Sequence, residues 1–521
     1  MFSFPWWLSL AIGFLSLSEE ILWVRVLGFG YQTLPFAFSF VLAFYLVGIA
    51  LGAAYGKRLC AHAKNLYAVA AVVLSIAAVG DALTPMLIVR LVARHGQEQA
   101  LALFAIAILL AAGLKSVLFP VAHHLGSMAE GPQVGRSVSR IYFGNIIGAT
   151  LGPLVTGFIA LDYLNVDECF ALIAGLCLLI SLACVLKSAR MPFLAAPLSA
   201  ALLLSLFTSA LAIPGAGALR ALAIGGNGEI THFSSNRHGV IHTLKTENGD
   251  YVFGTNVYDG IASTDVDRNA NRLDRVYMLA LMHPDAKRVL AVGMSTGAWV
   301  RAVQGFPGVE RIDVVEINPG YIDLLRLYPA LAPLLSDPRI HIHIDDGRRW
   351  LKRNPDARFD LIIQNTTYHW RSNAGNLLSR EYLENVKQHM NPGAVLTTNT
   401  TGSFDVLATM AAVFPYTYRY TNFGYASDRP LQPNFSLIKS VSRPDGSLFQ
   451  TVAPPGSVVA ALALGRIEPV NSFIARHDAA HAWIISDDNL VTEYRHGRRF
   501  GPQLLQALQP AQAPEFKFDE P

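Results

Sequence analysis

The sequence predicts a protein of two parts, an N-terminal all-α polytopic membrane bundle and a C-terminal α/β domain with a parallel, doubly wound sheet. Apolar stretches long enough to cross a membrane follow one another through residues 1–215. From residue 286 onward, short apolar runs alternate with helical stretches, as in a parallel sheet. A glycine-rich turn, Gly293–Gly297, follows the first of these runs, and Glu316 ends the second.

The first part is too apolar for an ordinary soluble domain. Hydrophobic residues make up 52% of the chain, mean hydropathy is +0.35, and the excess lies in the N-terminal half. About seven membrane-spanning helices are expected. They fall at 6–29, 36–56, 67–89, 100–122, 141–161, 169–186 and 193–213. We therefore expect residues 1–215 to be a multi-pass domain in the cell (inner) membrane, in contact with the lipid bilayer.

Two of these spans carry glycines at every fourth position, a spacing that allows two helices to approach closely. The glycines are Gly48, Gly52 and Gly56 in one span and Gly144, Gly148 and Gly152 in another. Charged side chains inside a bilayer need partners, and either a Glu20–Arg25 or an Asp81–Lys115 pair is expected. The four cysteines, Cys60, Cys169, Cys177 and Cys184, have no metal-site spacing, so no metal site is predicted.

Residues 216–285 are expected to hold a linker and a small antiparallel β-region. Its strands are predicted at 239–244, 250–254 and 256–260, and a helix at 274–282. Residues 286–521 form the larger domain. Its strands are predicted at 289–292, 312–317, 340–344, 361–363 and 395–398, and helices at 297–305, 318–327 and 379–390.

Candidate binding residues follow the strands of this sheet, where ligands of open α/β sheets bind. Gly293, Ser295 and Gly297 let the backbone approach a ligand closely. Glu316 can accept hydrogen bonds from both hydroxyls of a ribose, and Asp346, beside Gly347, from an adenine amino group. Two simpler interpretations stay open: Glu316 is a solvated acid at a strand end, or Asp346 caps a helix.

Residues from about 230 to 400 resemble the spermidine synthase (polyamine aminopropyltransferase) family. The resemblance rests on Tyr258-Asp259-Gly260, His283-Pro284, the Gly293–Gly297 loop, Glu316, Asp346-Gly347 and the run 377–382. The multispan N-terminus resembles the membrane-fused branch of that family. The resemblance implies a Rossmann-like (S-adenosylmethionine-methyltransferase-type) fold. It also implies decarboxylated S-adenosylmethionine as co-substrate, no prosthetic group, and a diamine acceptor such as putrescine.

The resemblance assigns the ribose of this donor to Glu316 and its adenine to Asp346 and Gly347. Substrate contacts are expected from Tyr258, Asp259, Thr296 and Trp370. The chain departs from the family pattern where Asn365-Thr-Thr-Tyr368 replaces an acidic motif, and where Thr296 replaces a loop aspartate. An amide is not a base near neutral pH, so His369 is a candidate replacement beside Asn365 and Tyr368.

These departures keep other functions open. One is a methyltransferase that uses S-adenosylmethionine itself; another is a non-catalytic polyamine or nucleoside sensor or transporter. The expected partners are a small-molecule amine and the bilayer, while a net charge of +3 gives no reason to expect nucleic acid. A homodimer stays open. Loop charges with seven spans place the C-terminal domain outside the cytoplasm, but a donor made in the cytoplasm favours the cytoplasmic side.

Overall fold

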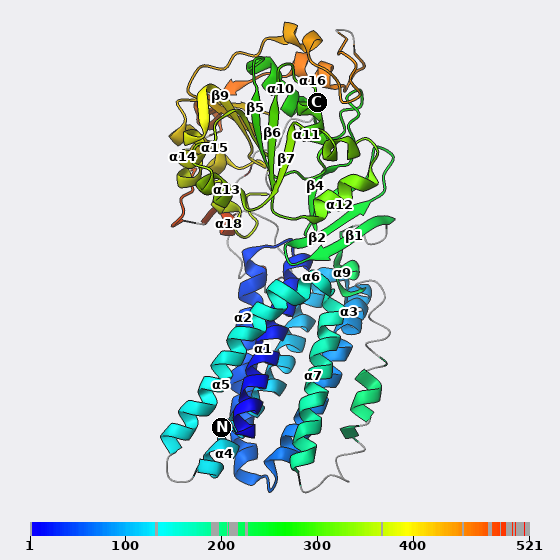
Figure 1. Ribbon diagram of the computed structural model, residues 1–521, viewed down its shortest axis with the longest axis vertical. Coiled ribbons are helices and arrows are strands. Elements are labelled where there is room, and N and C mark those ends of the chain that lie inside the picture. Colours follow the sequence, from blue (N-terminus) through cyan, green and yellow to red (C-terminus); the bar gives the residue numbers. More distant parts are fainter. Residues whose placement is uncertain are drawn as a thin grey trace. The chain divides into compact units, whose positions relative to one another are not determined.

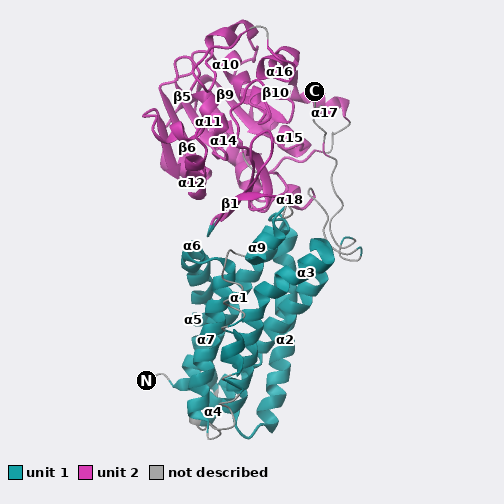
Figure 2. Cartoon of the chain, turned by 90° about the vertical axis from the view of Figure 1, so that its right-hand side faces the viewer, with its two compact units in different colours: residues 1–226, 235–237, 499–509 teal, residues 227–234, 238–498, 510–521 magenta. Residues whose placement is uncertain are grey.

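The chain forms two compact units in the computed structural model (Figure 2). One contains residues 1–226, 235–237 and 499–509, and the other contains 227–234, 238–498 and 510–521. The structure describes residues 3–130, 134–188, 217–224, 228–365, 368–450, 453–477, 482–489 and 491–495, with isolated positions between 197 and 207 and beyond 502.

Unit 1 is all-helical (Figure 1). Its elements are α1 (Phe4–Gly30), α2 (Pro35–His62), α3 (Leu66–Ser116), α4 (Leu118–Glu130), α5 (Val134–Val155), the π-helical turn η1 (Thr156–Ala160), α6 (Leu161–Tyr163), α7 (Val166–Lys187) and α9 (Gly217–Leu222). Asn165 begins α7 with a capping box, since its side chain accepts from the Glu168 backbone and Glu168 accepts in return. Helix α1 packs on α5, and α3 packs on α2 and α7.

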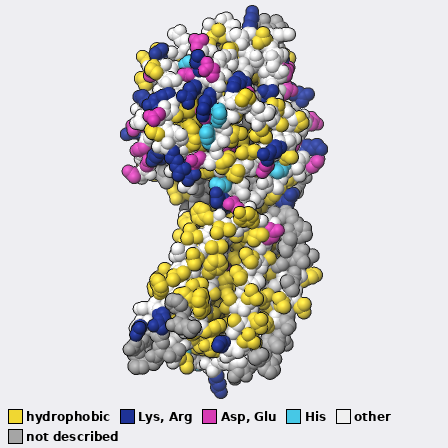
Figure 3. All heavy atoms as spheres, in the orientation of Figure 1, with side chains coloured by type: hydrophobic (Ala, Val, Ile, Leu, Met, Phe, Trp, Pro, Cys, Tyr) yellow, Lys and Arg dark blue, Asp and Glu magenta, His cyan; other side chains and the backbone are white. Residues whose placement is uncertain are grey.

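Four helical stretches of unit 1 are long and apolar enough to span a membrane. They are Pro35–His62, Leu66–Met128, Gly135–Tyr163 and Val166–Lys187. The face of unit 1 in Figure 3 is covered largely by hydrophobic side chains, whereas the face of unit 2 carries many charged ones. Leu51, Leu110 and Phe158 are each more than half exposed, as expected of lipid-facing residues. The last predicted span, 193–213, lies mostly outside the described residues.

Helix α3 turns back on itself at Gly96, whose φ of 71° and ψ of 162° are not helical. Asp81 and Lys115, 34 residues apart in sequence, are joined by a 2.8 Å contact. A straight helix would separate them by about 50 Å, because each residue rises ~1.5 Å. The two arms of α3 therefore form an antiparallel pair, and they correspond to the spans predicted at 67–89 and 100–122.

The two glycine series permit backbone contact between helices, as predicted. A Cβ added to Gly52 would lie 2.1 Å from the carbonyl oxygen of Gly113. One added to Gly148 would lie 1.9 Å from the carbonyl oxygen of Leu10. Both distances are far inside van der Waals contact, so α2 approaches the second arm of α3, and α5 approaches α1, only because these positions lack side chains.

A buried ionic cluster lies inside this bundle. The Lys115 ammonium is 2.8 Å from Asp81 Oδ1 and 2.8 Å from Glu19 Oε2, and all three side chains are at most 2% exposed. The predicted Asp81–Lys115 pair is thus confirmed, and Glu19 from α1 joins it. A single ammonium between two carboxylates links α1 to both arms of α3, and hydrogen-bonded ion pairs of this kind are what make buried charge tolerable.

Unit 2 begins with a four-stranded antiparallel sheet in the order β1-β2-β3-β4. The strands are β1 (Ile230–Asn236), β2 (Gly239–Leu244), β3 (Tyr251–Gly254) and β4 (Val257–Ile261), followed by helix α10 (Asp274–Met282). Three of the strands and α10 lie where the sequence predicts them. Strand β1 was not predicted, because its run Thr-His-Phe-Ser-Ser-Asn has little apolar alternation.

The second sheet of unit 2 has eight strands in the order β12-β10-β11-β9-β8-β5-β6-β7 (Figure 1). Five are parallel: β5 (Arg288–Val292), β6 (Arg311–Glu316), β7 (Ile340–Ile344), β8 (Phe359–Gln364) and β9 (Met390–Asn399). They fall where the sequence predicts parallel strands. The remaining three, β10 (Tyr416–Tyr420), β11 (Phe423–Ser427) and β12 (Glu468–Pro469), are antiparallel, so the sheet is mixed.

Helices cover both faces of this sheet. Alternate residues of each strand point to opposite sides, so the apolar strands present a hydrophobic surface on each face. Val289 and Ala291 of β5 pack in one core with α10, α11 (Ala298–Val303) and α12 (Gly320–Leu327). Leu290 and Val292 pack in the other core with α13 (Gly347–Arg353), α14 (Arg380–Gln388) and α15 (Phe404–Val413). The remaining helices of unit 2 are η2 (Ala332–Leu335), η3 (Ala374–Leu377), η4 (Phe435–Ser440), α16 (Val458–Leu464), α17 (Val470–Arg476) and α18 (Val491–Arg495).

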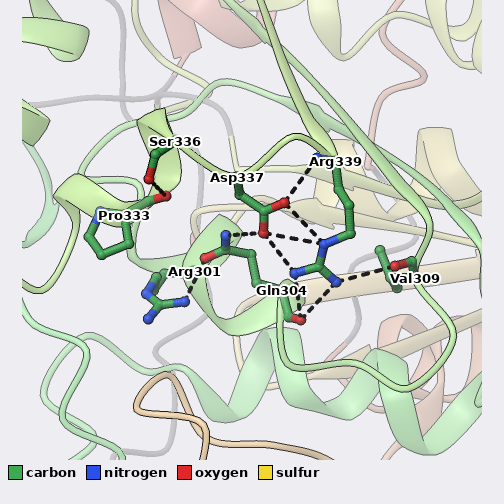
Figure 4. A network of polar contacts seen from close by, with 7 residues as sticks. All are labelled: Arg301, Gln304, Val309, Pro333, Ser336, Asp337 and Arg339. Atoms are coloured by element: carbon green, nitrogen blue, oxygen red, sulfur yellow. Dashed lines mark hydrogen bonds and ion pairs between the residues drawn. The ribbon is translucent and has the colours of Figure 1, made fainter.

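A polar network fastens the end of α11 to the start of β7 (Figure 4). Asp337 accepts from Gln304 Nε2 at 2.7 Å and from Arg339 Nη2 at 2.7 Å, and Arg339 also donates to the Val309 carbonyl. The hydrogen bond from Arg339 lowers the pKa of Asp337 to about 2. Because this network lies at the amino ends of the parallel strands, it stabilises the sheet at the edge opposite to the candidate site.

Candidate active site

Four predicted residues lie in a row along the carboxyl edge of the parallel sheet. The register pairs Val292 with both Val315 and Gln364, so Gly293 and Asn365 follow the ends of β5 and β8 beside Glu316, the last residue of β6. Strand β7 adds Asp346 just beyond its end. The strand order reverses at β5, because the chain continues to β6 and β7 on one side and then crosses to β8 and β9 on the other. Such a switch point is where doubly wound folds bind ligands.

Glu316 organises the loop that follows β5. Its Oε2 accepts from the Met294 N–H at 2.8 Å and its Oε1 accepts from the Asn318 N–H at 2.8 Å. The side chain is 4% exposed, and this burial raises its pKa to about 7, against the lowering effect of the two backbone donors. Glu316 is therefore not a solvated strand-end acid, and it lies against the loop where a ligand's hydroxyl groups would approach.

The backbone of this loop adopts positive φ angles at three positions, a conformation that glycine favours. Gly293, Ser295 and Gly297 have φ values of +83°, +50° and +76°. A Cβ on Gly293 would lie 3.2 Å from the Asn365 carbonyl oxygen, and one on Gly297 would collide with Leu325 and Leu334. The first glycine thus allows β5 and the loop after β8 to converge, and the last allows α11 to begin against the core.

Asp346 begins helix α13. Its Oδ1 accepts from the Arg349 N–H at 2.8 Å, which is a helix N-cap. The capping interpretation is therefore correct for one oxygen of this carboxylate. The next residue, Gly347, has no side chain, and a Cβ there would lie 2.6 Å from Val292 Cγ1. The glycine therefore allows α13 to pack close to β5.

A cavity of about 870 Å³ opens beside this edge. Asn365 and Tyr368 line it from the loop after β8, and Tyr258 and Asp259 line it from β4. A smaller pocket adjoins it, lined by the loop residues Gly293, Met294, Ser295 and Thr296. The two spaces share Asp259, Asn271, Trp299 and Asn365, so these four side chains lie where the cavity meets the glycine loop.

Among the described residues shared by the two spaces, Asp259 is the one that carries a carboxylate. The Tyr321 hydroxyl donates to its Oδ2, and Ser295 Oγ donates to its backbone carbonyl. Burial raises the pKa of Asp259 to about 6, while the Tyr321 hydroxyl and the charge of Arg371 act in the opposite direction. Asp259 therefore changes protonation near neutral pH, the range in which a side chain works well as a proton acceptor.

The loop after β8 divides its residues between the cavity and the core. Asn365 Oδ1 accepts from Asn399 Nδ2 at 3.1 Å, and Asn399 Oδ1 accepts from Asn422 Nδ2 at 2.9 Å. His369 is 1% exposed and does not line the cavity; its Nδ1 lies 2.6 Å from Thr401 Oγ1, and Thr401 does line it. Trp370 is buried against Tyr368, with ring centroids 5.2 Å apart.

Sequence reasoning missed several residues of the site, namely Asn271, Arg275, Tyr321 and Asn399. Asn271 lines both spaces and its Nδ2 lies 3.5 Å from Thr296 Oγ1. Tyr321 follows Glu316 by five positions, yet only the packing of β4 against α12 brings it to Asp259. No local pattern marks such residues, because each is placed by an element distant in sequence from its partner.

Comparisons with known proteins agree with this architecture. Residues 276–413 match the family model of the spermine/spermidine synthase domain. A polyamine aminopropyltransferase from Agathobacter rectalis is 41% identical over 87 residues, which cover 16% of this chain and 30% of that protein. Spermidine synthase 2 from Hyoscyamus niger is 29% identical over 178 residues, or 31% of this chain and 58% of that protein.

Among solved structures, spermidine synthase from Thermotoga maritima aligns with 45% of this chain and 84% of its own, at 18% identity and a TM-score of 0.37. The chain spans less than two thirds of the length of either of the two curated relatives, 30% and 58%. The matched residues contain β5 through β9 and the carboxyl edge on which Glu316, Asp346 and Asn365 lie. Within its C-terminal unit, residues 276–413 of this chain are thus similar to the spermine/spermidine synthase domain.

Proposed function

We propose that this protein is a membrane-anchored aminopropyltransferase that moves the aminopropyl group of decarboxylated S-adenosylmethionine to an amine, a diamine such as putrescine by analogy with its family. The observation that carries this proposal is the lining of the smaller pocket. Among the described residues, this lining includes the Asp259 carboxylate but no Lys or Arg. An aminopropyl ammonium needs such an acid, whereas the carboxylate of S-adenosylmethionine would need a cation.

The donor would lie along the carboxyl edge. Glu316 would accept hydrogen bonds from its ribose hydroxyls, and Asp346 and Gly347 would bind its adenine. Its aminopropyl chain would lie along the Gly293–Gly297 loop, near Thr296. The sulfonium carbon would then face the junction at Asp259 and Asn365. This order follows the strand order β7-β6-β5-β8 from adenine to reaction centre.

In the proposed reaction, the acceptor nitrogen attacks the propyl carbon bonded to sulfur. A carbon–nitrogen bond forms, and the carbon–sulfur bond breaks with its electron pair left on sulfur, so methylthioadenosine leaves uncharged. The new ammonium then loses a proton. Asn365 cannot accept it, whereas Asp259 can. Asn365, Tyr368 and Tyr258 would position the amine, Trp370 would support the Tyr368 ring, and His369 would act through Thr401.

The test offers the detergent-purified full chain both S-adenosylmethionine and its decarboxylated form with a panel of amines. Mass spectrometry identifies the nucleoside product. We expect methylthioadenosine, formed only with the decarboxylated donor and an amine. S-adenosylhomocysteine would instead make the protein a methyltransferase, and adenosine binding without either product would make it a sensor or transporter.

The pH dependence of acceptor use should follow Asp259. Its pKa is raised to about 6, so the carboxylate forms as pH rises through 6 and is lost below it. At saturating donor, the ratio of kcat/KM between the wild type and Asp259→Asn should exceed about 10 at pH 8 and fall toward 1 below pH 5. Taking this ratio cancels the ionisation of the amine itself. A ratio that stays constant from pH 5 to 8 would exclude Asp259 as the titrating group.

A further inference from the structure

The larger cavity has an unusual charge distribution for a protein that uses an amine. Among the residues that the structure describes, five arginines and three acids line it. The arginines are Arg272, Arg275, Arg419, Arg466 and Arg476, and the acids are Asp259, Asp274 and Glu468. A purely cationic acceptor would therefore enter a space whose lining is itself positive.

The acids beyond the reaction centre already have partners. Glu468 Oε1 lies 2.9 Å from Arg419 Nη1, and its Oε2 lies 2.6 Å from Arg476 Nη2. Asp274 accepts from the Tyr420 hydroxyl at 2.8 Å and from Asn269 Nδ2 at 2.6 Å. Each oxygen of these two carboxylates already accepts a hydrogen bond from the protein, so both acids are engaged before an acceptor binds.

Two arginines that line the same cavity are not neutralised by a paired carboxylate among the described residues. Arg275 Nε donates to Thr421 Oγ1 at 3.1 Å, and its guanidinium lies over the Phe423 ring, 5.3 Å from the centroid. In the part of the chain that the structure describes, neither Arg275 nor Arg272 forms an ion pair with a carboxylate at 4.0 Å or less. Burial lowers the pKa of Arg275; Asp274 opposes this lowering and the nearby charge of Arg272 adds to it.

Two neighbouring guanidinium groups repel each other, and burial beside a cavity adds to that cost. An anion between them would relieve both effects. The planar, forked donor arrangement of guanidinium suits carboxylate and phosphate oxygens. The stacking of Arg275 on Phe423 holds one fork in place before any ligand arrives, which reduces the entropy lost on binding.

We propose that the acceptor carries an anionic group, a carboxylate or a phosphate, in addition to the amine that is alkylated, and that Arg272 and Arg275 bind this anion. The amine would lie at Asp259 and Asn365, which line the same cavity. This inference rests on the proposed function for the identity of the reaction. The bonds exchanged are those given above, and the product is an aminopropylated amino acid or amino phosphate.

Matched pairs of amines test the inference by calorimetry, with the full chain saturated with methylthioadenosine. Ornithine differs from putrescine only by a carboxylate, and phosphoethanolamine differs from ethanolamine only by a phosphate. We expect the anionic member of at least one pair to bind at least tenfold more tightly. The pair that shows the preference distinguishes a carboxylate site from a phosphate site.

Arg275→Met should remove that preference, and Arg272→Met provides a second variant in case the first does not fold. Arg268→Met is the matched control, because Arg268 is exposed, pairs with Asp265 and does not line the cavity. Equal or tighter binding of the plain amines would overturn the inference, as would a preference that survives both variants. Binding is read without turnover, so a protein that yields no methylthioadenosine would refute the proposed function without deciding the anion site.

Discussion

Replacing Glu316 with glutamine is expected to weaken binding of the donor nucleoside by about 100-fold, or ~3 kcal/mol. The carboxylate lies at the end of β6, and both of its oxygens accept from backbone N–H groups of the adjoining loops. An amide nitrogen in place of one oxygen would face a donor rather than accept from it. It would also lose the charge that strengthens hydrogen bonds from ribose hydroxyls.

Titration with methylthioadenosine measures this effect, and formation of methylthioadenosine from the decarboxylated donor should fall in parallel. Glu310→Gln is the matched control, because Glu310 is exposed, pairs with Lys287 and lies at the opposite end of the same strand. Its affinity should equal that of the wild type. A dissociation constant for Glu316→Gln within threefold of the wild type would show that the donor does not contact this carboxylate.

The second large effect is expected in unit 1, from Lys115→Met. Removing the ammonium leaves Glu19 and Asp81 as two buried carboxylates that shared it, each at most 2% exposed. Breaking a buried ion pair costs about 3–5 kcal/mol, which is comparable to the whole stability of many domains. We expect the variant to lose its folded peak in detergent gel filtration or to unfold at a much lower temperature.

The charge balance of the cluster gives a sharper comparison. Glu19→Gln removes one of two acids and leaves a neutral Lys115–Asp81 pair, so it should cost less than Lys115→Met. Combining Lys115→Met with Glu19→Gln and Asp81→Asn should restore part of the loss. Lys57→Met, at an exposed position on α2, serves as the control. Equal unfolding temperatures for Lys115→Met and Lys57→Met would show that the cluster does not stabilise the bundle.

Much of unit 2 could be predicted because its strands are apolar runs of the right length. Helix α10 begins at Asp274 and ends at Met282, as predicted from the turn residues around it. Strands β10 and β11 escaped prediction because their tyrosines, arginine and serines do not form an apolar run. Their burial comes from pairing with β9 and packing against α15 and α17, which are tertiary effects.

The site was predictable where a residue follows its own strand, as Glu316 and Asn365 do. The site was harder to predict where the direction of a side chain decides whether the residue lines the cavity. His369 is adjacent to Tyr368 in sequence, yet Tyr368 lines the cavity while the imidazole of His369 turns to Thr401. The arginines that line the larger cavity could not be predicted as a group for a similar reason. Arg275 and Arg419, for example, come from α10 and β10, 144 positions apart.

The reversal of α3 at Gly96 also bears on how these helices would enter a bilayer. A single Lys or Asp at the centre of a helix opposes insertion by about 2.5–3.5 kcal/mol. Asp81 and Lys115 lie on the two arms of one hairpin and meet at 2.8 Å, so a hairpin that inserts as a unit carries them into hydrocarbon as a neutral pair. Glu19, on the earlier helix α1, would pair with this ammonium once the hairpin has inserted. Because Asp81 and Lys115 lie on the same hairpin, each would neutralise the charge of the other during insertion, before Glu19 contributes.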